Sequence, residues 1–329
     1  MLIAGDIGGT KTNLALFDES KGSGKYFQFE SFHSKDYKGF EEILKAYLSD
    51  CKKAGYEGPF RAACFAIAGP VKEGVCKATN LPWVVDAHAL SQALKISQVY
   101  LINDLEANAW AIEILSAESL MTLYSGQGSL RGNRAVVSPG TGLGEAGLFW
   151  DGHRHHPFAC EGGHCEFGPC NLLEVELSSY LIHRFGHASY ERVLSGPGLH
   201  NIYRFYVESK GRSEPEWLVN EMKTKDPAAV ISENALNGRS PLCEETLNLF
   251  VNIFGSEAGN CALKFMAFGG VFLGGGIPPK ILPKLKEPFF LKGFIDKGRL
   301  QSLLETIPIY IVLDDKASLR GAAHYCRSH

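Results

Sequence analysis

The chain lacks an excess of charge of either sign. It has 33 lysines and arginines against 36 aspartates and glutamates, which gives a formal net charge of −3 over 329 residues. A basic stripe that would attract nucleic acid or a membrane surface is therefore not expected. The sequence also has no uninterrupted apolar run of the roughly 20 residues that a membrane-spanning helix requires. We expect neither nucleic acid nor a membrane among its partners.

The features of a secreted, disulfide-bonded protein are missing as well. The first residues lead directly into an apolar strand, without the charged segment and apolar core of a secretion signal. The nine cysteines are an odd number, show no framework spacing and include no C-x-x-C pair. That pattern favours reduced thiols over disulfides. We therefore expect a cytoplasmic location.

One segment is rich in residue types that bind metals. Closed zinc sites usually contain closely spaced ligand pairs, and this segment contains none. We favour an exposed histidine-rich loop that precedes a functional segment, with zinc as the alternative. The residues concerned, which fall within 18 positions, are His153, His155, His156, Cys160, His164, Cys165 and Cys170.

The most informative segment that is present is GDIGGTKTN at residues 5–13. It lies between two apolar runs, which predicts a strand, a tight turn and a second strand. Paired glycines let such a turn wrap an oxyanion, and the threonine hydroxyls add donors. Asp6, just before the turn, is placed to hold Mg²⁺ through water. The segment predicts a phosphate site, and an ordinary glycine hairpin is the alternative.

Short apolar strands alternate with helical stretches along the chain, which is typical of an α/β protein. A length of 329 residues favours two domains over one. We predict strands at residues 2–4, 14–17, 60–67, 99–102, 135–137, 145–150, 271–273 and 309–313. We predict helices at residues 105–115, 171–185, 244–267 and 317–325.

Three glycine-rich turns, at residues 8–9, 140–144 and 274–276, each follow an apolar strand. Residues 142–147 match the dinucleotide fingerprint G-x-G-x-x-G, but that fingerprint must open a helix, and residues 145–150 have the pattern of a strand. We therefore reject a dinucleotide site, and the G-x-x-x-x-G-K-[ST] run of P-loop enzymes is absent. The first two turns predict two similarly built halves that face one another across a cleft.

Polar residues occur at two further places that suggest chemistry. Asn103 and Asp104 lie where a strand ends and a helix begins, which is where open α/β sheets bind ligands. Phosphoryl transfer to an alcohol needs a base such as Asp104, although an aspartate there can simply cap the helix. Glu161, His164 and Glu191 offer mixed donors and acceptors that suit sugar hydroxyls. A loop histidine and a helix-terminal carboxylate are the alternatives.

Taken together, these segments resemble the bacterial-type glucokinase family, in the superfamily of hexokinases and actin-like ATPases. The resemblance spans nearly the whole chain. Related zinc-containing sugar kinases carry a C-x-C-G-x-x-G-C block, where this chain has CEFGPC at residues 165–170, so it resembles the zinc-free branch. The five blocks that carry the resemblance are GDIGGTKTN, LINDLEANAW, SPGTGLGEAGL, EGGHCEFGP and ERVLSGPGLHNIYR.

The resemblance implies an α/β fold of two actin-like (ribonuclease H-like) domains that face each other across a cleft. The small domain would comprise residues 1–109 and 315–329, and the large domain residues 110–314. The implied activity is that of a glycolytic transferase, a kinase that uses ATP and Mg²⁺ to phosphorylate glucose at its 6-hydroxyl, giving glucose 6-phosphate and ADP. A homodimer is also implied.

The resemblance further implies roles for individual residues. Asp104 would be the general base. Asp6 would orient Mg²⁺ through water. The glucose hydroxyls would be bound by Asn103, Glu161, His164 and Glu191. ATP would be bound by Gly5, Asp6, Ile7, Gly8, Gly9, Thr10, Gly140, Thr141, Gly142, Gly275 and Gly276.

Two other classes of protein remain in view. A sugar-sensing regulator would bind without turnover, and the absence of a segment for a DNA-binding helix-turn-helix disfavours it. An actin-like ATPase would hydrolyse ATP without sugar, which the set of Glu161, His164 and Glu191 disfavours. Within the enzyme class, fructose, mannose or an aminosugar as acceptor, and ADP or polyphosphate as donor, stay open. The oligomeric state and any regulation stay open too.

Overall fold

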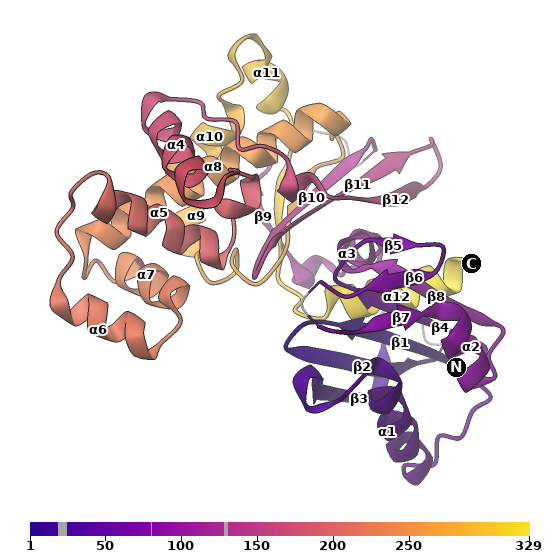
Figure 1. The fold of residues 1–329 in the computed structure, drawn as a ribbon. Helices are drawn as coiled ribbons and strands as arrows, with labels where there is room; N and C mark the ends of the chain where they lie inside the picture. Colours follow the sequence, from indigo (N-terminus) through magenta and orange to yellow (C-terminus); the bar gives the residue numbers. More distant parts are fainter. Residues whose placement is uncertain (19–24, 80, 128–130) are drawn as a thin grey trace. The chain divides into compact units, whose positions relative to one another are not determined.

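The computed structural model describes residues 1–18, 25–79, 81–127 and 131–329, which form two compact units. The first unit comprises residues 1–119, 157–159 and 314–329, and the second comprises residues 120–156 and 160–313. Each unit contains a sheet with helices packed against it (Figure 1). No helix within the described ranges combines the length and the apolar character that crossing a membrane demands.

The first unit is built on a five-stranded sheet in the order β3-β2-β1-β4-β8. The strands β1, β2 and β3 pair antiparallel, whereas β4 and β8 continue the sheet parallel to β1. Their bounds are β1 Leu2–Ile7, β2 Lys11–Phe17, β3 Tyr26–His33, β4 Ala62–Ile67 and β8 Gln98–Asn103. The strands predicted at residues 2–4, 14–17, 60–67 and 99–102 are confirmed.

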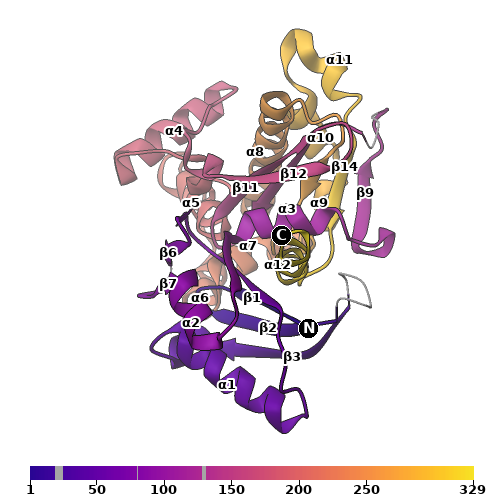
Figure 2. The same cartoon turned by 90° about the vertical axis from the view of Figure 1, so that its right-hand side faces the viewer.

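Helices cover both faces of this sheet. On one face α1 (Phe40–Lys53) and α2 (Ala87–Leu94) bury apolar side chains against it, and on the other α3 (Asp104–Ile112) and α12 (Ala317–Ser328) do so. Figures 1 and 2 both show α3 beside α12. Gly321 permits this close packing, because a Cβ there would lie 1.7 Å from the carbonyl oxygen of Ala107. Short elements complete the unit: β5 Val71–Lys72, β6 Val75–Lys77, β7 Val84–Asp86, η2 Ser34–Asp36 and η3 Ala117–Ser119.

The second unit is built on a six-stranded sheet in the order β12-β11-β10-β13-β14-β9. Strands β10 and β11 form an antiparallel hairpin with β12 beyond β11, and β13 and β14 follow parallel to β10. The topology of the first sheet therefore recurs, with β9 added antiparallel at the edge. This repetition confirms the predicted α/β fold of two similarly built halves. The bounds are β9 Leu120–Tyr124, β10 Arg134–Pro139, β11 Leu143–Trp150, β12 His155–Cys160, β13 Val271–Leu273 and β14 Ile309–Val312.

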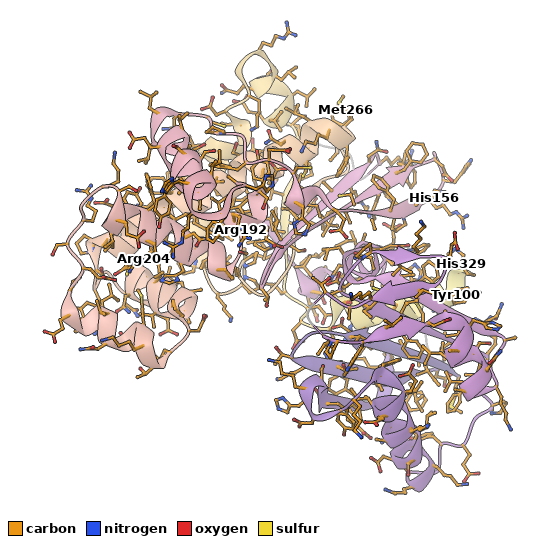
Figure 3. All side chains as sticks on the ribbon, viewed as in Figure 1. Tyr100, His156, Arg192, Arg204, Met266 and His329 are labelled. Atoms are coloured by element: carbon orange, nitrogen blue, oxygen red, sulfur yellow. The ribbon has the colours of Figure 1, made fainter. Side chains whose placement is uncertain are left out.

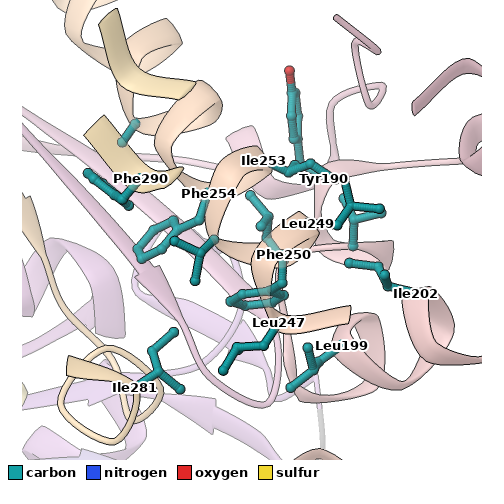
Figure 4. Packing of buried hydrophobic residues seen from close by; sticks show 14 of the residues in the cluster. Tyr190, Leu199, Ile202, Leu247, Leu249, Phe250, Ile253, Phe254, Ile281 and Phe290 are labelled. Carbon is teal, nitrogen blue, oxygen red and sulfur yellow. The ribbon is translucent and has the colours of Figure 1, made fainter. Parts of the chain in front are cut away.

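The long helix α8 (Pro241–Phe265) supplies much of the core of the second unit. Its Leu247, Phe250 and Phe254 are fully buried, and Figure 4 shows them among side chains from other helices. The predicted apolar face of this helix is thereby confirmed. The remaining helices are α4 Leu172–Phe185, α5 Gly196–Glu208, α6 Glu216–Thr224, α7 Pro227–Leu236, α9 Leu282–Leu285, α10 Pro288–Ile295 and α11 Gln301–Leu304, with η4 Gly162–His164, η5 Tyr190–Arg192 and η6 Gly298–Leu300.

The predicted strands and helices are all present, with differences of a few residues at their ends, and the structure has further elements that were not predicted, among them α1, α5, β3 and β9. The segment with the dinucleotide-type glycines is strand β11, so rejecting that fingerprint is confirmed. Helix α8 begins at Pro241 rather than at residue 244, because the Ser240 side chain accepts a hydrogen bond from the Cys243 N–H and proline starts the first turn. Helix α3 ends at Ile112 rather than at residue 115.

Candidate active site

The glycine turn of the first unit follows strand β1 and is fixed by hydroxyl groups. The Gly8 N–H donates to the Lys11 carbonyl (3.0 Å), and the Ser34 hydroxyl donates to the Gly8 carbonyl (2.7 Å). The Ser34 N–H donates to the Thr10 carbonyl (3.0 Å), and its hydroxyl also lies 3.0 Å from that of Thr12. Ser34 thus holds the turn at both ends, while Thr10 stays exposed to solvent.

Two residues predicted for the same phosphate site lie inside the strand instead of in the turn. Gly5 and Ile7 are buried in β1. Gly5 has a packing reason to be glycine, because a Cβ there would lie 2.7 Å from the Phe65 ring and 2.8 Å from Leu14. In this segment the groups at the surface of the turn are therefore those of Gly8, Gly9 and Thr10.

Asp6 lies at the end of β1 and is half-buried. Its Oδ1 accepts a hydrogen bond from the Ser318 hydroxyl (3.1 Å), which comes from the first turn of α12. Burial raises the pKa of Asp6, while the hydrogen bonds from Ser318 and Asn13 act in the opposite direction. A partly desolvated carboxylate among neutral oxygen groups is a donor set that suits Mg²⁺ held through water.

The junction between β8 and α3 separates the roles of two adjacent residues. Asn103 is the N-cap of α3: its Oδ1 accepts from the N–H groups of Leu105 (2.8 Å) and Glu106 (3.3 Å), and its amide donates to the Gly69 carbonyl (3.1 Å). Asp104 is the first residue of the helix, half-buried, and its Oδ1 accepts from the Leu105 N–H (3.0 Å). The cap is therefore made by Asn103, which leaves the Asp104 carboxylate at the helix start, where a negative charge is favoured.

Strand register brings these two parts of the first unit to one edge of the sheet. Ile7 pairs with Ile67, and Ile67 pairs with Asn103, all in parallel strands. The turn after β1 and the junction after β8 are therefore separated by two strand spacings, about 10 Å. The carboxyl ends of parallel strands are where such sheets bind ligands.

The two glycine turns of the second unit lie beside each other. They follow the neighbouring parallel strands β10 and β13. The Gly140 N–H donates to the Gly142 carbonyl (2.8 Å), and a Cβ on Gly140 would lie 4.0 Å from the Gly276 nitrogen. Gly275 has φ +82°, and a Cβ there would lie 2.5 Å from the Pro139 carbonyl oxygen. The second of these turns thus requires glycine at position 275, and the main chains of the two turns lie next to each other.

The first residue of β11 contacts both loops that carry the predicted sugar-binding residues. The Leu143 N–H donates to Glu191 Oε2 (3.0 Å), and a Cβ on Gly142 would lie 2.4 Å from the same oxygen. The Leu143 carbonyl faces Gly163, where a Cβ would lie 2.2 Å from the oxygen. The main chain at Leu143 therefore fixes Glu191 and the 161–164 loop together, although these segments are distant in sequence.

Glu161 precedes the short helix η4 and His164 is its last residue, and both are exposed. The His164 N–H donates to the Glu161 carbonyl (3.1 Å), so the loop closes on itself and presents both side chains to solvent. Glu191 is half-buried. Arg192, which follows it, is labelled in Figure 3. Its guanidinium lies over the Phe185 ring, 4.3 Å from the centroid. That arginine is thereby turned toward α4.

The histidine-rich segment is not the exposed loop that the sequence predicted, because residues 155–160 form strand β12 and His155 is buried. The His155 ring lies 3.0 Å from the Gly132 carbonyl oxygen, and His156 pairs with Asp151 at 2.7 Å. Among the described residues, the group of acidic, cysteine or histidine side chains close enough to share an ion is elsewhere: Glu145, Glu257 and Cys261, all buried. Nothing local in the sequence indicates this group, because 112 residues separate its two glutamates.

Each unit thus offers a distinct chemistry. The first presents a hydroxyl-braced glycine turn and an aspartate at one sheet edge, which suits an anionic phosphate and proton removal. The second presents paired glycine turns beside exposed carboxylate and imidazole groups, which suit a phosphate chain and a polyhydroxyl compound.

The family model for glucokinase matches residues 3–329. A glucokinase of Nostoc punctiforme is 40% identical over 337 residues, which cover 98% of each chain. Among solved structures, a glucokinase from an Antarctic psychrotroph superimposes with a TM-score of 0.85 at 33% identity, covering 100% of this chain and 99% of that one. A ROK-family glucokinase from Streptomyces griseus, in complex with glucose and AMPPNP, gives a TM-score of 0.67 at 20% identity, covering 100% and 99%.

Proposed function

The chain belongs to the glucokinase family and phosphorylates glucose with ATP, and we propose that it transfers the phosphoryl group to the 6-hydroxyl with Asp104 as general base. The observation that carries this proposal is the junction of β8 and α3. Asn103 is the N-cap of α3, and Asp104 follows it as the first residue of the helix, with its Oδ1 accepting from the Leu105 N–H. It lies at the same sheet edge as the glycine turn after β1.

Proton removal is the step that Asp104 would perform. Phosphoryl transfer passes through a loose transition state in which little covalent chemistry is required of the protein, so positioning and charge stabilisation dominate. An aspartate beside the attacking hydroxyl accepts its proton as the O–P bond forms. The N-terminus of α3 favours the ionised aspartate that this role needs.

Glucose would be bound chiefly by Glu161, His164 and Glu191. The first two are exposed on one short loop, and Leu143 ties that loop to Glu191. Carboxylates accept from sugar hydroxyls, and an imidazole both donates and accepts. The Asn103 amide has one N–H donating to Gly69, and its second N–H would reach a hydroxyl.

ATP would be bound by the glycine turns. Peptide groups at Gly8, Gly9 and Thr10 in the first unit, and at Gly140, Thr141 and Gly142 in the second, would hold phosphate oxygens, with Gly275 and Gly276 on the adenosine side. Asp6 would orient Mg²⁺ through water, with Ser318 fixing its carboxylate. The bound ion supplies charge neutralisation for the phosphates. Gly5 and Ile7 would contribute by fixing the strand before the turn.

Broader assignments follow from the same family. We propose that residues 1–109 with 315–329 form the small domain and residues 110–314 the large one, that the enzyme serves glycolysis, and that it is a homodimer. A cytoplasmic location is supported by the cysteines, all nine of which are free thiols.

The test is a panel of hexoses crossed with phosphoryl donors, read by product formation. The proposal expects glucose with Mg-ATP to give the highest kcat/KM and the product to be glucose 6-phosphate by NMR. Substitution Glu161→Gln should raise the KM for glucose far more than the KM for ATP. Phosphorylation of 6-deoxyglucose at a rate near that of glucose would rule out the 6-hydroxyl as acceptor.

A further inference from the structure

Beneath the sugar-binding loops of the second unit lies a buried pair of acids. Glu145, from β11, is 2% exposed, and Glu257, from α8, is fully buried. Oxygen atoms of both carboxyl groups and the Cys261 sulfur lie within 4.8 Å of one another. Two ionised carboxylates this close in an apolar interior would repel strongly, so the pair needs a proton, a cation or both.

The hydrogen-bond donors around the pair are unequally shared. Glu257 Oε2 accepts from the Asn260 amide (2.8 Å), and its Oε1 accepts from Lys264 Nζ (3.3 Å); the Tyr190 hydroxyl also donates to this carboxylate. Glu145 Oε2 accepts from the Cys261 thiol (3.4 Å), a weak donor whose sulfur also lies 3.6 Å from Glu257 Oε1. Its buried Oε1 has no hydrogen-bond partner among the residues that the structure describes.

This asymmetry decides where the proton resides. Both oxygens of Glu257 already accept from an amide or an ammonium donor, so the hydrogen bond between the two acids runs from Glu145 to Glu257. Glu145, which lacks them, is stabilised as the acid, and its O–H then donates to Glu257 and removes the unsatisfied oxygen. With Glu145 neutral, Glu257 and Lys264 balance each other's charge.

The acid pair touches the two loops that carry the proposed glucose ligands. Glu145 Oε2 lies against Gly162, where a Cβ would be 1.9 Å away, and the Glu145 carbonyl accepts from the Cys160 thiol (3.4 Å). Gly162 is next to Glu161. Glu257 holds the hydroxyl of Tyr190, which is next to Glu191. Figure 4 shows the Tyr190 ring on the apolar cluster of α8, with its hydroxyl pointing away from that cluster.

We propose that Glu145 is a positioning residue for glucose binding, which acts as a buried carboxylic acid that shares its proton with Glu257 and supports the loop at Gly162. The inference rests on the proposed glucose site. Loss of the proton places a second negative charge beside Glu257, and the carboxylate of Glu145 then moves away from its neighbour and disturbs the Gly162 contact.

The groups that face Glu145 point to one titration near neutral pH. They are Glu257, Cys261 and Lys264 from α8 and Cys160 from β12. The negative charge of Glu161 in turn contributes to raising the pKa of the Cys160 thiol. Burial and the neighbouring Glu257 raise the pKa of Glu145 to about 7. Burial raises the pKa values of both thiols further above their usual range, so both stay protonated there.

The experiment measures KM for glucose and for ATP between about pH 6 and about pH 8.5 in the intact enzyme. We expect the KM for glucose of the unmodified protein to rise several-fold over this range while the KM for ATP stays within twofold. Glu145→Gln keeps a neutral side chain that can donate to Glu257, so it should retain the low KM for glucose at the alkaline end. Glu145→Ala should raise the KM for glucose about tenfold at every pH.

A double substitution tests the contact itself. Gly162→Ala forces its new methyl group into the Glu145 carboxyl, so it should raise the KM for glucose about as much as Glu145→Ala does. In the variant that carries both Glu145→Ala and Gly162→Ala, the Glu145 carboxyl is absent and leaves room for the new methyl group. The rise in the KM for glucose should therefore be no larger than in either single variant. Multiplicative effects of the two substitutions would refute the contact.

Other outcomes separate this inference from the proposed glucose site. If Glu161→Gln raises the KM for glucose but the pH-dependent rise persists in Glu145→Gln, the site stands and the positioning role of Glu145 is overturned. If Glu161→Gln has no effect while Glu145→Ala does, the assignment of Glu161 fails and the role of Glu145 stands. One equivalent of zinc that survives dialysis against a chelator in the unmodified protein, and is lost in Glu145→Gln, would replace the shared proton with a metal.

Discussion

The two units share a sheet topology but differ in what they bury. Among the residues that the structure describes, the first unit buries no aspartate, glutamate, lysine or arginine side chain to the extent that the second does. Its buried polar groups are neutral: Thr12, Ser34, Asn103 and Ser318. The buried ionisable side chains of the second unit include Glu145, Glu174, Glu257 and Lys284.

The difference follows from how each unit holds its candidate site residues. In the first unit, hydroxyl and amide groups fix the glycine turn and the start of α3. In the second, the candidate glucose ligands lie on loops supported by main-chain groups at Leu143 and by the acid pair. Neutral hydrogen bonds do not change with pH, whereas a shared proton does. The chemistry should therefore depend on the first unit, and the pH response of glucose binding on the second.

Among the substitutions that test this difference between the units, Asp104→Asn in the first unit should have the largest effect. If Asp104 removes the hydroxyl proton, the asparagine variant should lose about 10²–10⁴-fold in kcat with little change in the KM for glucose. The residue keeps its size, and Asn103 still caps α3, so thermal unfolding should be nearly unchanged. Steady-state kinetics with a coupled assay and a thermal melt measure both quantities. Near-normal turnover would remove Asp104 from the mechanism.

Much of this first-unit arrangement could be predicted from the sequence because its signals are local. The glycine turn follows its strand directly, and Asn103 and Asp104 occupy the strand-to-helix junction. What the sequence did not decide is which of the two caps the helix. That choice depends on the Asn103 amide, which also reaches Gly69, 34 residues earlier. The hydrogen bonds between Ser34 and the glycine turn could not be predicted for the same reason, because they join residues that are distant in the sequence.

The second unit was less predictable from sequence, since its contacts join distant segments. The strand at β11 was expected, but nothing in LGEAGLFW marks Glu145 as buried, and its partner lies 112 residues further on. The pairing of Glu191 with the Leu143 N–H spans 48 residues. Strands β3 and β9 were not predicted, because their side chains are mostly half-buried and give little alternation.

Glu145→Gln should change the free energy of unfolding, with an effect smaller than that of Asp104→Asn on turnover. The folded pKa of Glu145 is raised to about 7, above the ordinary 4.5 of an unfolded chain. The contribution of its protonated form is therefore fully present below about pH 4.5 and is lost as the pH rises through about 7. The glutamine variant, which has no such proton to lose, should match the unmodified protein near pH 5 and exceed it by about 1–3 kcal/mol near pH 8.5.

Denaturant unfolding at the two pH values measures that difference. Glu257→Gln is the matched control, since it replaces the carboxylate that accepts the shared proton by a neutral amide and leaves Lys264 without its anionic partner at 3.3 Å. That variant should be destabilised at both pH values. A constant stability difference between Glu145→Gln and the unmodified protein across the range would show that Glu145 does not titrate there.

The smallest effect should come from Glu174→Gln, which sharpens the comparison within the second unit. Glu174 is as buried as Glu145, but its carboxylate is supplied with donors: Oε2 accepts from the Cys170 N–H (2.7 Å) and Oε1 from the Asn171 amide (2.8 Å), while Asn171 caps α4. This is a reciprocal capping arrangement in which each carboxylate oxygen accepts from an N–H group. Glutamine weakens it, so stability near neutral pH should fall by about 1 kcal/mol, opposite in sign to the effect of Glu145→Gln at alkaline pH. The KM for glucose should keep its pH profile. If Glu174→Gln instead raised the free energy of unfolding, burial rather than the supply of hydrogen-bond donors would decide how each buried acid affects stability.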